Sequence, residues 1–185
     1  EITTAALRSG RIDDPDYPMF VNAIQSMSNL PVYISDCSEM TTMDIRADLQ
    51  RLKDKHGVEL AVIDYEGLLD DDNDKDANTR STLISKRVHA IFKDLNIAGI
   101  SIAGMNKDGI RGTTKGQGAV AGTSNSLHDA DQIIVMRKNS DDGNLIRCTW
   151  EKMREGEADR FFDLVKLKQF PTFKDAMLQN NGRHQ

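Results

Sequence analysis

The sequence predicts an α/β domain built around a doubly wound, mostly parallel sheet. Short apolar runs rich in β-branched residues alternate with longer segments whose apolar residues recur at helical spacing. The resulting order of strand, helix, strand, helix and strand favours right-handed crossovers with helices packed on the sheet. A length of 185 residues is sufficient for one such domain with a hydrophobic core.

Three elements are expected before residue 57: a helix over residues 14–27, a strand over residues 30–34, and a helix that begins at Thr41 or Thr42. Pro31 is tolerable because it stands near the start of its strand. The second helix has a Thr cap and basic residues in its last turn. Gly57 follows that turn and suits the left-handed position that ends many helices.

The centre of the chain is expected to hold two buried strands joined by a helix. The apolar runs 58–63 and 97–103 are too short and too β-branched for helices, and they read as parallel strands. Between them, apolar residues over 83–95 trace one face of a helix. This unit supplies the parallel part of the predicted sheet.

The C-terminal third is expected to be antiparallel. A strand is expected over residues 132–136, and segments 145–151 and 160–165 are expected to pair as a hairpin at the sheet edge. We expect the domain to span residues 1–173 and residues 174–185 to form a loosely ordered tail.

Composition excludes several classes of protein. With 29% charged and 38% hydrophobic residues, long disorder and collagen-like or disulfide-rich scaffolds are not expected. The longest weakly polar run, residues 97–105, is about half of a membrane span, so no membrane association is expected. Cys37 and Cys148 lack metal or redox spacing, which favours a reducing cytoplasm. Because the net charge is -5, nucleic-acid contact would require a local basic patch.

Asp64 is the first candidate functional residue. It directly follows a buried strand, and ligands of open α/β sheets bind at the carboxyl ends of the strands. A carboxylate in this place commonly holds Mg²⁺ beside nucleotide phosphates, often through water. The alternative is that Asp64 only caps a neighbouring helix, and the residue alone does not decide between these interpretations.

A basic, Gly-rich segment over residues 104–118 is the second candidate. It carries Lys107, Arg111 and Lys115, and it follows a strand at the same edge of the sheet as Asp64. Cations and backbone N–H groups in such a loop can track a phosphodiester backbone without reading its sequence. The segment holds no aromatic residue, so base stacking is not indicated. Composition alone favours the alternative of a solvated loop.

Lys152 and Arg154 form the third candidate. Residues two apart on a strand point to the same side, so both cations are expected to project together from the edge. Two such cations can reach phosphates bound outside their own subunit, as an arginine finger does. The alternative is that basic side chains on an edge strand discourage aggregation.

These motifs stand in one order that resembles a known family. They are Ala61-Val-Ile-Asp64-Tyr65, Asn106-Lys107, Asp129-Ala130-Asp131 and Lys152-Met-Arg154-Glu-Gly156. Over residues 7–165 the chain resembles the later part of the RecA-like motor domain of DnaB-type replicative hexameric helicases, superfamily four. The resemblance implies a RecA-like P-loop NTPase core, with a mostly parallel twisted sheet flanked by helices and a C-terminal antiparallel hairpin.

The resemblance also implies roles. Asp64 would be the Walker B acid associated with ATP and Mg²⁺, and Lys152 and Arg154 would act in trans on the neighbouring subunit's nucleotide. DNA would be contacted by Asn106, Lys107, Arg111 and Lys115. The implied function is ATP-driven translocation on single-stranded DNA and duplex unwinding in a homo-oligomeric, hexameric ring, with primase or a helicase loader as further partners.

Departures from the family pattern leave alternatives open. Gly104 stands where the family has a Gln sensor, and no Gly-x-x-x-x-Gly-Lys-Ser/Thr motif occurs. The phosphate loop and the family's catalytic Glu are expected upstream of Glu1, so the chain alone is expected to be inactive. One alternative is a RecA-like recombination mediator or regulatory ATPase. Another is a non-enzymatic partner-binding module.

Overall fold

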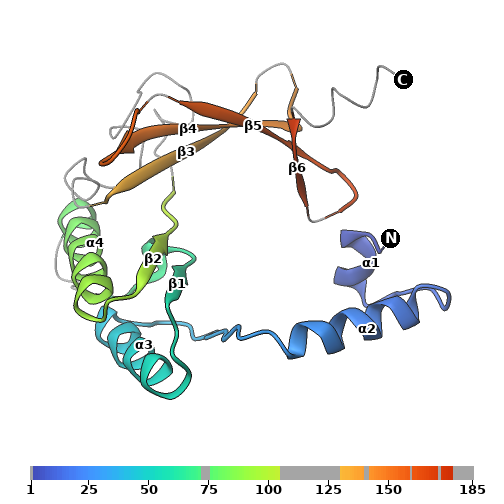
Figure 1. Cartoon of the computed structure of the whole chain (residues 1–185), viewed down its shortest axis with the longest axis horizontal. Coiled ribbons are helices and arrows are strands. Elements are labelled where there is room, and N and C mark those ends of the chain that lie inside the picture. Colours follow the sequence, from blue (N-terminus) through green and yellow to red (C-terminus); the bar gives the residue numbers. More distant parts are fainter. Residues whose placement is uncertain are drawn as a thin grey trace. The chain divides into compact units, whose positions relative to one another are not determined.

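The computed structural model describes residues 2–71, 76–104, 130–139, 142–158, 160–170 and 172–176 (Figure 1). The chain divides into two units. One comprises Glu1–Ser35, Ile134–Trp150 and Glu157–Gln185, and the other comprises Asp36–Ile133 and Glu151–Gly156. Among the described residues, no helix is long and apolar enough to cross a membrane.

The second unit contains the parallel strands. Its elements are α3 (Thr42–His56), β1 (Leu60–Ile63), the 3₁₀ turn η1 (Glu66–Leu68), α4 (Ala77–Asp94) and β2 (Ala98–Ser101). β1 and β2 pair in parallel, from Leu60 opposite Ala98 to Ile63 opposite Ser101. The predicted pair of strands joined by a helix is therefore confirmed, with each strand slightly shorter than its apolar run.

Local sequence signals set the ends of α3. The Thr41 side chain accepts a hydrogen bond from the Asp44 backbone N–H, and the Asp44 carboxylate accepts one from the Thr41 N–H, which completes a capping box. Gly57 ends the helix in the left-handed conformation at φ +66°. Both predicted ends of this helix are confirmed.

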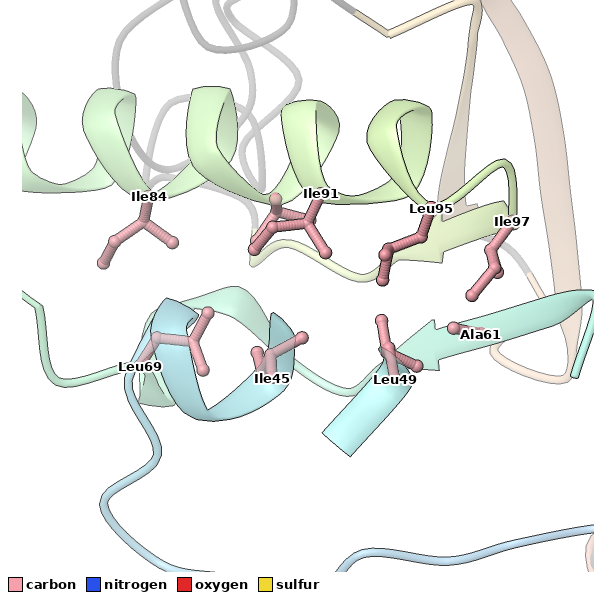
Figure 2. Close-up of a cluster of buried hydrophobic side chains, with 9 residues drawn as sticks. Ile45, Leu49, Ala61, Leu69, Ile84, Ile91, Leu95 and Ile97 are labelled. Carbon is pink, nitrogen blue, oxygen red and sulfur yellow. The ribbon is translucent and has the colours of Figure 1, made fainter. Parts of the chain in front are cut away.

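The core of the second unit lies between α3, α4 and one face of the β1–β2 sheet. Side chains from α4 and α3 point toward one another (Figure 2). The buried residues are Ile45, Leu49, Ala61, Leu69, Ile84, Val88, Ile91, Leu95 and Ile97. A Cβ added at Gly99 would overlap the Phe92 ring, so the glycine lets α4 lie close to β2.

The other face of the β1–β2 sheet is apolar and exposed. Leu60 and Val62 of β1 are 53% and 57% exposed, and Ile100 of β2 is 51% exposed. Their neighbour Ala61 faces the core, as the period of two along a strand requires. Parallel sheets are normally covered on both faces, so this surface is unusual for its strand type.

A buried carboxylate ties α3 to α4. Asp71 is 6% exposed and accepts hydrogen bonds from the Thr42 backbone N–H at 2.8 Å and from the Thr42 hydroxyl. Arg87 of α4 lies 2.8 Å from the same carboxylate. Burial alone would raise the pKa of Asp71, but the hydrogen bonds from Thr42 and the pairing with Arg87 together lower it.

The remaining elements are two helices and a second sheet. They are α1 (Thr4–Ser9), α2 (Tyr17–Ser28), β3 (Gln132–Lys138), β4 (Leu145–Met153), β5 (Phe161–Lys166) and β6 (Phe173–Asp175). The sheet has the order β3-β4-β5-β6, and β5 is antiparallel to both β4 and β6. The predicted pairing of the two strands is therefore confirmed, but their expected place at the sheet edge is wrong, because β3 and β6 flank them. The sequence did not reveal β6.

Side-chain pairs reinforce the hairpin. Arg147 and Asp163 lie opposite each other and pair through two N–H···O contacts of 2.9 Å each. The Arg147 guanidinium also lies 4.2 Å from the centre of the Phe161 ring. On the same two strands, the rings of Trp150 and Phe162 lie 5.1 Å apart.

The prediction of a strand over residues 30–34 is wrong. Pro31 has no backbone N–H, and the Val32 N–H donates to the Leu30 carbonyl at 2.8 Å, which is a local turn and not a ladder contact. The segment is assigned to no strand, and Ile34 is 87% exposed. The helix expected over residues 14–27 exists but begins at Tyr17, with Pro18 in its first turn.

Candidate functional site

The candidate site begins at the carboxyl ends of β1 and β2. Asp64 follows β1 directly and is exposed, so it is available to a ligand at this edge. The Ile102 N–H donates to the Ile63 carbonyl at 3.0 Å, which holds the two strand ends together just before Asp64. One exposed carboxylate at this place fits the way proteins hold Mg²⁺ through one or two carboxylates, waters and phosphate.

A second carboxylate at this edge points inward. Glu66 is half-buried, and its Oε1 accepts a 2.5 Å hydrogen bond from the Ser101 hydroxyl at the end of β2. Its backbone N–H donates to the Ile102 carbonyl at 3.1 Å. Burial raises the pKa of Glu66, against the hydrogen bonds from Ser101 and Ser85, which lower it. Asp64 and Glu66 therefore face different surroundings although only Tyr65 separates them.

Tyr65 itself shapes this turn. A Cβ added at Gly67 would lie 2.5 Å from the Tyr65 ring, so the ring occupies the space over the glycine. The Leu68 N–H donates to the Tyr65 carbonyl at 3.1 Å and begins the short helical turn η1. The residues after Asp64 are thus folded tightly against the end of the sheet.

The predicted pair of cations lies at the end of β4, with a correction. Lys152 is on the strand, but β4 ends at Met153, so Arg154 lies in the following turn and not on the strand. The expectation that both side chains project from one face of a strand is therefore wrong. The Arg154 backbone N–H donates to the Asp131 carbonyl at 2.9 Å, which draws this residue toward the start of β3.

Arg154 also makes an ion pair with Asp131. Its Nη1 atom lies 2.6 Å from Asp131 Oδ1, and both side chains are more than half exposed, at 58% and 66%. A polar hollow of about 330 Å³ is lined by Asp131, Gln132, Arg154 and Glu155. Within this chain, Arg154 is therefore oriented by Asp131.

The predicted DNA contacts cannot be placed. Asn106, Lys107, Arg111 and Lys115 all lie outside the described residues. The described stretch that contains β2 ends at Gly104, which is exposed; within the described residues, no atom lies within 4 Å of a Cβ added there.

Sequence reasoning missed the roles of Glu66 and Asp131. Both are acidic residues near a strand end, and the sequence alone does not tell which polar partner a strand end will meet. Asp131 directly precedes β3, where a strand is expected from the sequence, but its ion pair with Arg154 is not predicted. One feature of the sequence could have indicated this ion pair: Asp131, just before β3, and Arg154, just after β4, have opposite charges.

Other kinds of site receive no support among the residues that the structure describes. No group of three His, Cys, Asp or Glu side chains there is placed to hold a metal ion. Neither Cys37, which is exposed, nor Cys148, which is buried, forms a disulfide in the described part of the chain. Burial raises the pKa of the Cys148 thiol, which makes it a poor nucleophile.

Comparison with known proteins identifies the family to which this chain belongs. The sequence profile of the DnaB-like helicase C-terminal domain matches residues 1–175. The replicative DNA helicase DnaB of Mycobacterium intracellulare is 28% identical over 177 residues, which cover 93% of this chain and 29% of that protein. The DnaB of Geobacillus stearothermophilus is 26% identical over 182 residues, which cover 93% of this chain and 40% of that protein. The chain thus spans less than half the length of these relatives.

Solved structures show the same fold. A solved ATPase domain matches with a TM-score of 0.84 at 18% identity, over 94% of this chain and 66% of that chain. A DnaB-like replicative helicase, solved in a study of its interactions with primase, matches with a TM-score of 0.82 at 18% identity, over 93% of this chain and 44% of that chain. The predicted RecA-like α/β fold is confirmed, and the chain belongs to the DnaB-like helicase C-terminal domain family.

Proposed function

We propose that this chain is part of the motor domain of an ATP-dependent DNA helicase subunit, which couples ATP hydrolysis to movement along single-stranded DNA. The observation that carries the proposal is the family match over residues 1–175. The exposed carboxylate of Asp64 at the carboxyl end of a parallel strand supports it, because this is the usual place of a nucleotide site. Bound ATP and Mg²⁺ would supply the energy and the charge neutralisation.

The described residues would have distinct roles in this function. Asp64 would orient Mg²⁺ through water, and the half-buried Glu66 would keep the turn after it in place. Lys152 and Arg154 would extend toward the nucleotide of an adjacent subunit in a ring, where an arginine stabilises charge that develops during phosphoryl transfer. Asn106, Lys107, Arg111 and Lys115 would contact the DNA backbone.

The exposed apolar face of β1–β2 supports the proposal that further sequence completes the motor domain. Leu60, Val62 and Ile100 lie on this face, and a parallel sheet is stable only when such side chains are covered. We therefore propose that residues 1–173 are the later part of a motor domain whose phosphate-binding segment lies elsewhere in a longer protein. A cytoplasmic location and a primase or loader partner belong to the same proposal.

The test is made on the full-length protein that contains this chain. ATP hydrolysis is measured with and without single-stranded DNA, and unwinding is measured on a forked duplex. We expect DNA to stimulate hydrolysis and the fork to open only with ATP, and Asp64→Ala should abolish both activities. Glu59→Ala, at the opposite end of β1, is the matched control because Glu59 is exposed and takes no part in the site.

The same assay separates the alternatives. Stimulated hydrolysis without unwinding would support a RecA-like mediator or regulatory ATPase, which the Gly at position 104 favours over a helicase. The absence of any nucleotide hydrolysis in the full-length protein would support a partner-binding module and contradict the helicase function.

A further inference from the structure

The β5–β6 hairpin carries a basic segment that the candidate site does not use. Residues 164–174 contain Lys166, Lys168 and Lys174 and no Asp or Glu, although the chain as a whole has a net charge of -5. All three lysines are exposed. The hairpin is therefore a local basic surface on an acidic chain, and a local surface of this kind can attract a polyanion.

The pairing of the hairpin places an aromatic ring beside these cations. Lys166 of β5 stands opposite Phe173 of β6, so the two side chains are neighbours on one face of the ribbon. Phe173 is 46% exposed. Lys174 is opposite Val165 and belongs to the other face, because successive residues of a strand alternate between faces. The hairpin thus presents an exposed ring with a cation beside it and another cation across the edge of the ribbon.

The helix α1 brings a further cation from a distant part of the sequence. The Thr4 backbone N–H donates to the Gln169 carbonyl at 3.0 Å, and the Thr4 hydroxyl donates to the same carbonyl at 3.4 Å. These contacts hold α1 beside the turn of the hairpin. Arg8 is exposed and lies one helical turn after Thr4, on the same side of α1. We call the resulting set the hairpin surface: Arg8, Lys166, Lys168, Phe173 and Lys174.

The acids that flank the basic segment are either paired or distant from the turn. Asp163 pairs with Arg147 through two contacts of 2.9 Å, and Asp175 stands opposite Leu164, at the end of β6 away from the turn. Lysines on an edge strand often discourage pairing with other chains, and β6 ends the described sheet. An exposed phenylalanine on the same strand does not serve that purpose, so the lysines and the ring together require another explanation.

We propose that the hairpin surface binds single-stranded DNA without reading its sequence. Its cations neutralise backbone phosphates, and the Phe173 ring stacks against a base. An acidic protein would use the same cations but has no flat base for the ring, so the exposed Phe173 favours a nucleic acid. The inference rests on the proposed function only for the choice of DNA as the polymer. It adds a contact surface separate from the basic segment over residues 104–118.

The experiment measures binding of a fluorescein-labelled oligothymidylate to the full-length protein by anisotropy at several salt concentrations, without nucleotide. Each lost phosphate contact should reduce the slope of log affinity against log salt by about 0.7, the value for single strands. The triple variant Lys166→Ala, Lys168→Ala and Lys174→Ala should therefore lose about 2 from the slope. The corresponding triple Arg variant should keep the slope, because it keeps the charges.

Two further variants sharpen the test. Phe173→Leu should weaken binding at a fixed salt concentration by at least about fivefold and leave the slope unchanged, because stacking is independent of counterion release. The matched control is the double variant Lys55→Ala and Lys93→Ala, which removes exposed lysines of α3 and α4. The control should change neither slope nor affinity.

The outcomes separate this inference from the function on which it rests. Failure of the unaltered protein to bind the oligonucleotide overturns both. An unchanged slope in the triple Ala variant overturns only the hairpin surface, since hydrolysis and unwinding test the helicase function independently. The hairpin surface alone is also overturned if the triple Arg variant is as weak as the triple Ala variant, or if weak binding follows a fall in thermal stability. If Phe173→Leu binds normally and polyglutamate displaces the oligonucleotide at equal charge, the surface fits an acidic protein and the DNA assignment is overturned.

Discussion

At the scale of single residues, neighbouring acids in this chain have opposite relations to solvent. Asp64 is exposed at the end of β1, whereas Glu66 and Asp71 are turned toward hydroxyl and guanidinium donors. The first is available to a ligand, and the other two hold elements together. Substitutions at the first should change chemistry, and substitutions at the others should change geometry or stability.

Arg154→Ala should reduce ATP turnover of the assembled full-length protein by at least about 100-fold, because arginines that reach a nucleotide from another subunit contribute roughly 10³–10⁵ in rate. Steady-state hydrolysis is the measurement, with assembly checked by size. Arg160→Ala removes another exposed arginine and serves as the control. Unchanged turnover in an intact assembly would exclude the trans role.

Asp131→Ala should have little effect on folding and a larger effect on turnover. The pair with Arg154 is exposed, so its loss should change the free energy of unfolding by under about 1 kcal/mol. Without its carboxylate, the guanidinium is no longer oriented, and turnover should fall several-fold. Urea denaturation and steady-state hydrolysis measure the two effects, and a large loss of stability with normal turnover would contradict this assignment.

Asp71→Asn should destabilise the unit at neutral pH by about 1–3 kcal/mol, because it weakens hydrogen bonds to a buried charge. The lowered pKa of Asp71 means that its contribution is present above the ordinary value near 3.8 and is lost as pH falls through the folded-state value. The difference between Asp71→Asn and the unaltered protein should therefore shrink in acid. Denaturation at neutral and acidic pH measures it, and a difference that grows in acid would contradict a lowered pKa.

At the scale of elements, α4 supplies three of the nine buried core residues, Ile84, Val88 and Ile91, which is more than any other element supplies. Ile91 is 4% exposed and faces α3, so Ile91→Ala should cost about 2–5 kcal/mol through lost burial and a cavity. Ile34→Ala is the matched control, because Ile34 is 87% exposed and its truncation should change stability by under about 0.5 kcal/mol. Denaturation followed by helical circular dichroism compares them, and equal effects would contradict the described packing.

The sequence predicts an element well when the residues that determine it are close to one another along the chain. The ends of α3 follow from Thr41, Asp44 and Gly57, all of which act within one turn, and they were predicted closely. The strand predicted at 30–34 does not form. An apolar run becomes a strand only when another strand pairs with it, and no local signal in the sequence shows whether such a partner exists. In the site, Asp64 could be predicted from its place after a strand, whereas the contact of Glu66 with Ser101 joins residues 35 apart and could not.

At the scale of the whole molecule, the mildly acidic total conceals an uneven distribution of charge. The net charge of -5 does not by itself suggest a nucleic-acid partner, yet the candidate contacts are basic residues grouped in a few segments. The β1–β2 sheet also has an exposed apolar face, and parallel sheets normally have both faces covered by other elements. The exposed face supports the proposal that this chain is one part of a larger motor domain.

The ring contact between Trp150 and Phe162 has a practical consequence for studying the two units. Trp150 is the only tryptophan of the chain, and it belongs to the unit that holds the β4–β5 hairpin. The long helices α3 and α4 belong to the other unit. Indole emission therefore reports on the hairpin, while helical ellipticity is weighted toward the helical core. We expect Ile91→Ala to shift the ellipticity transition more than the emission transition in urea, and coincident shifts would show that both units unfold as one.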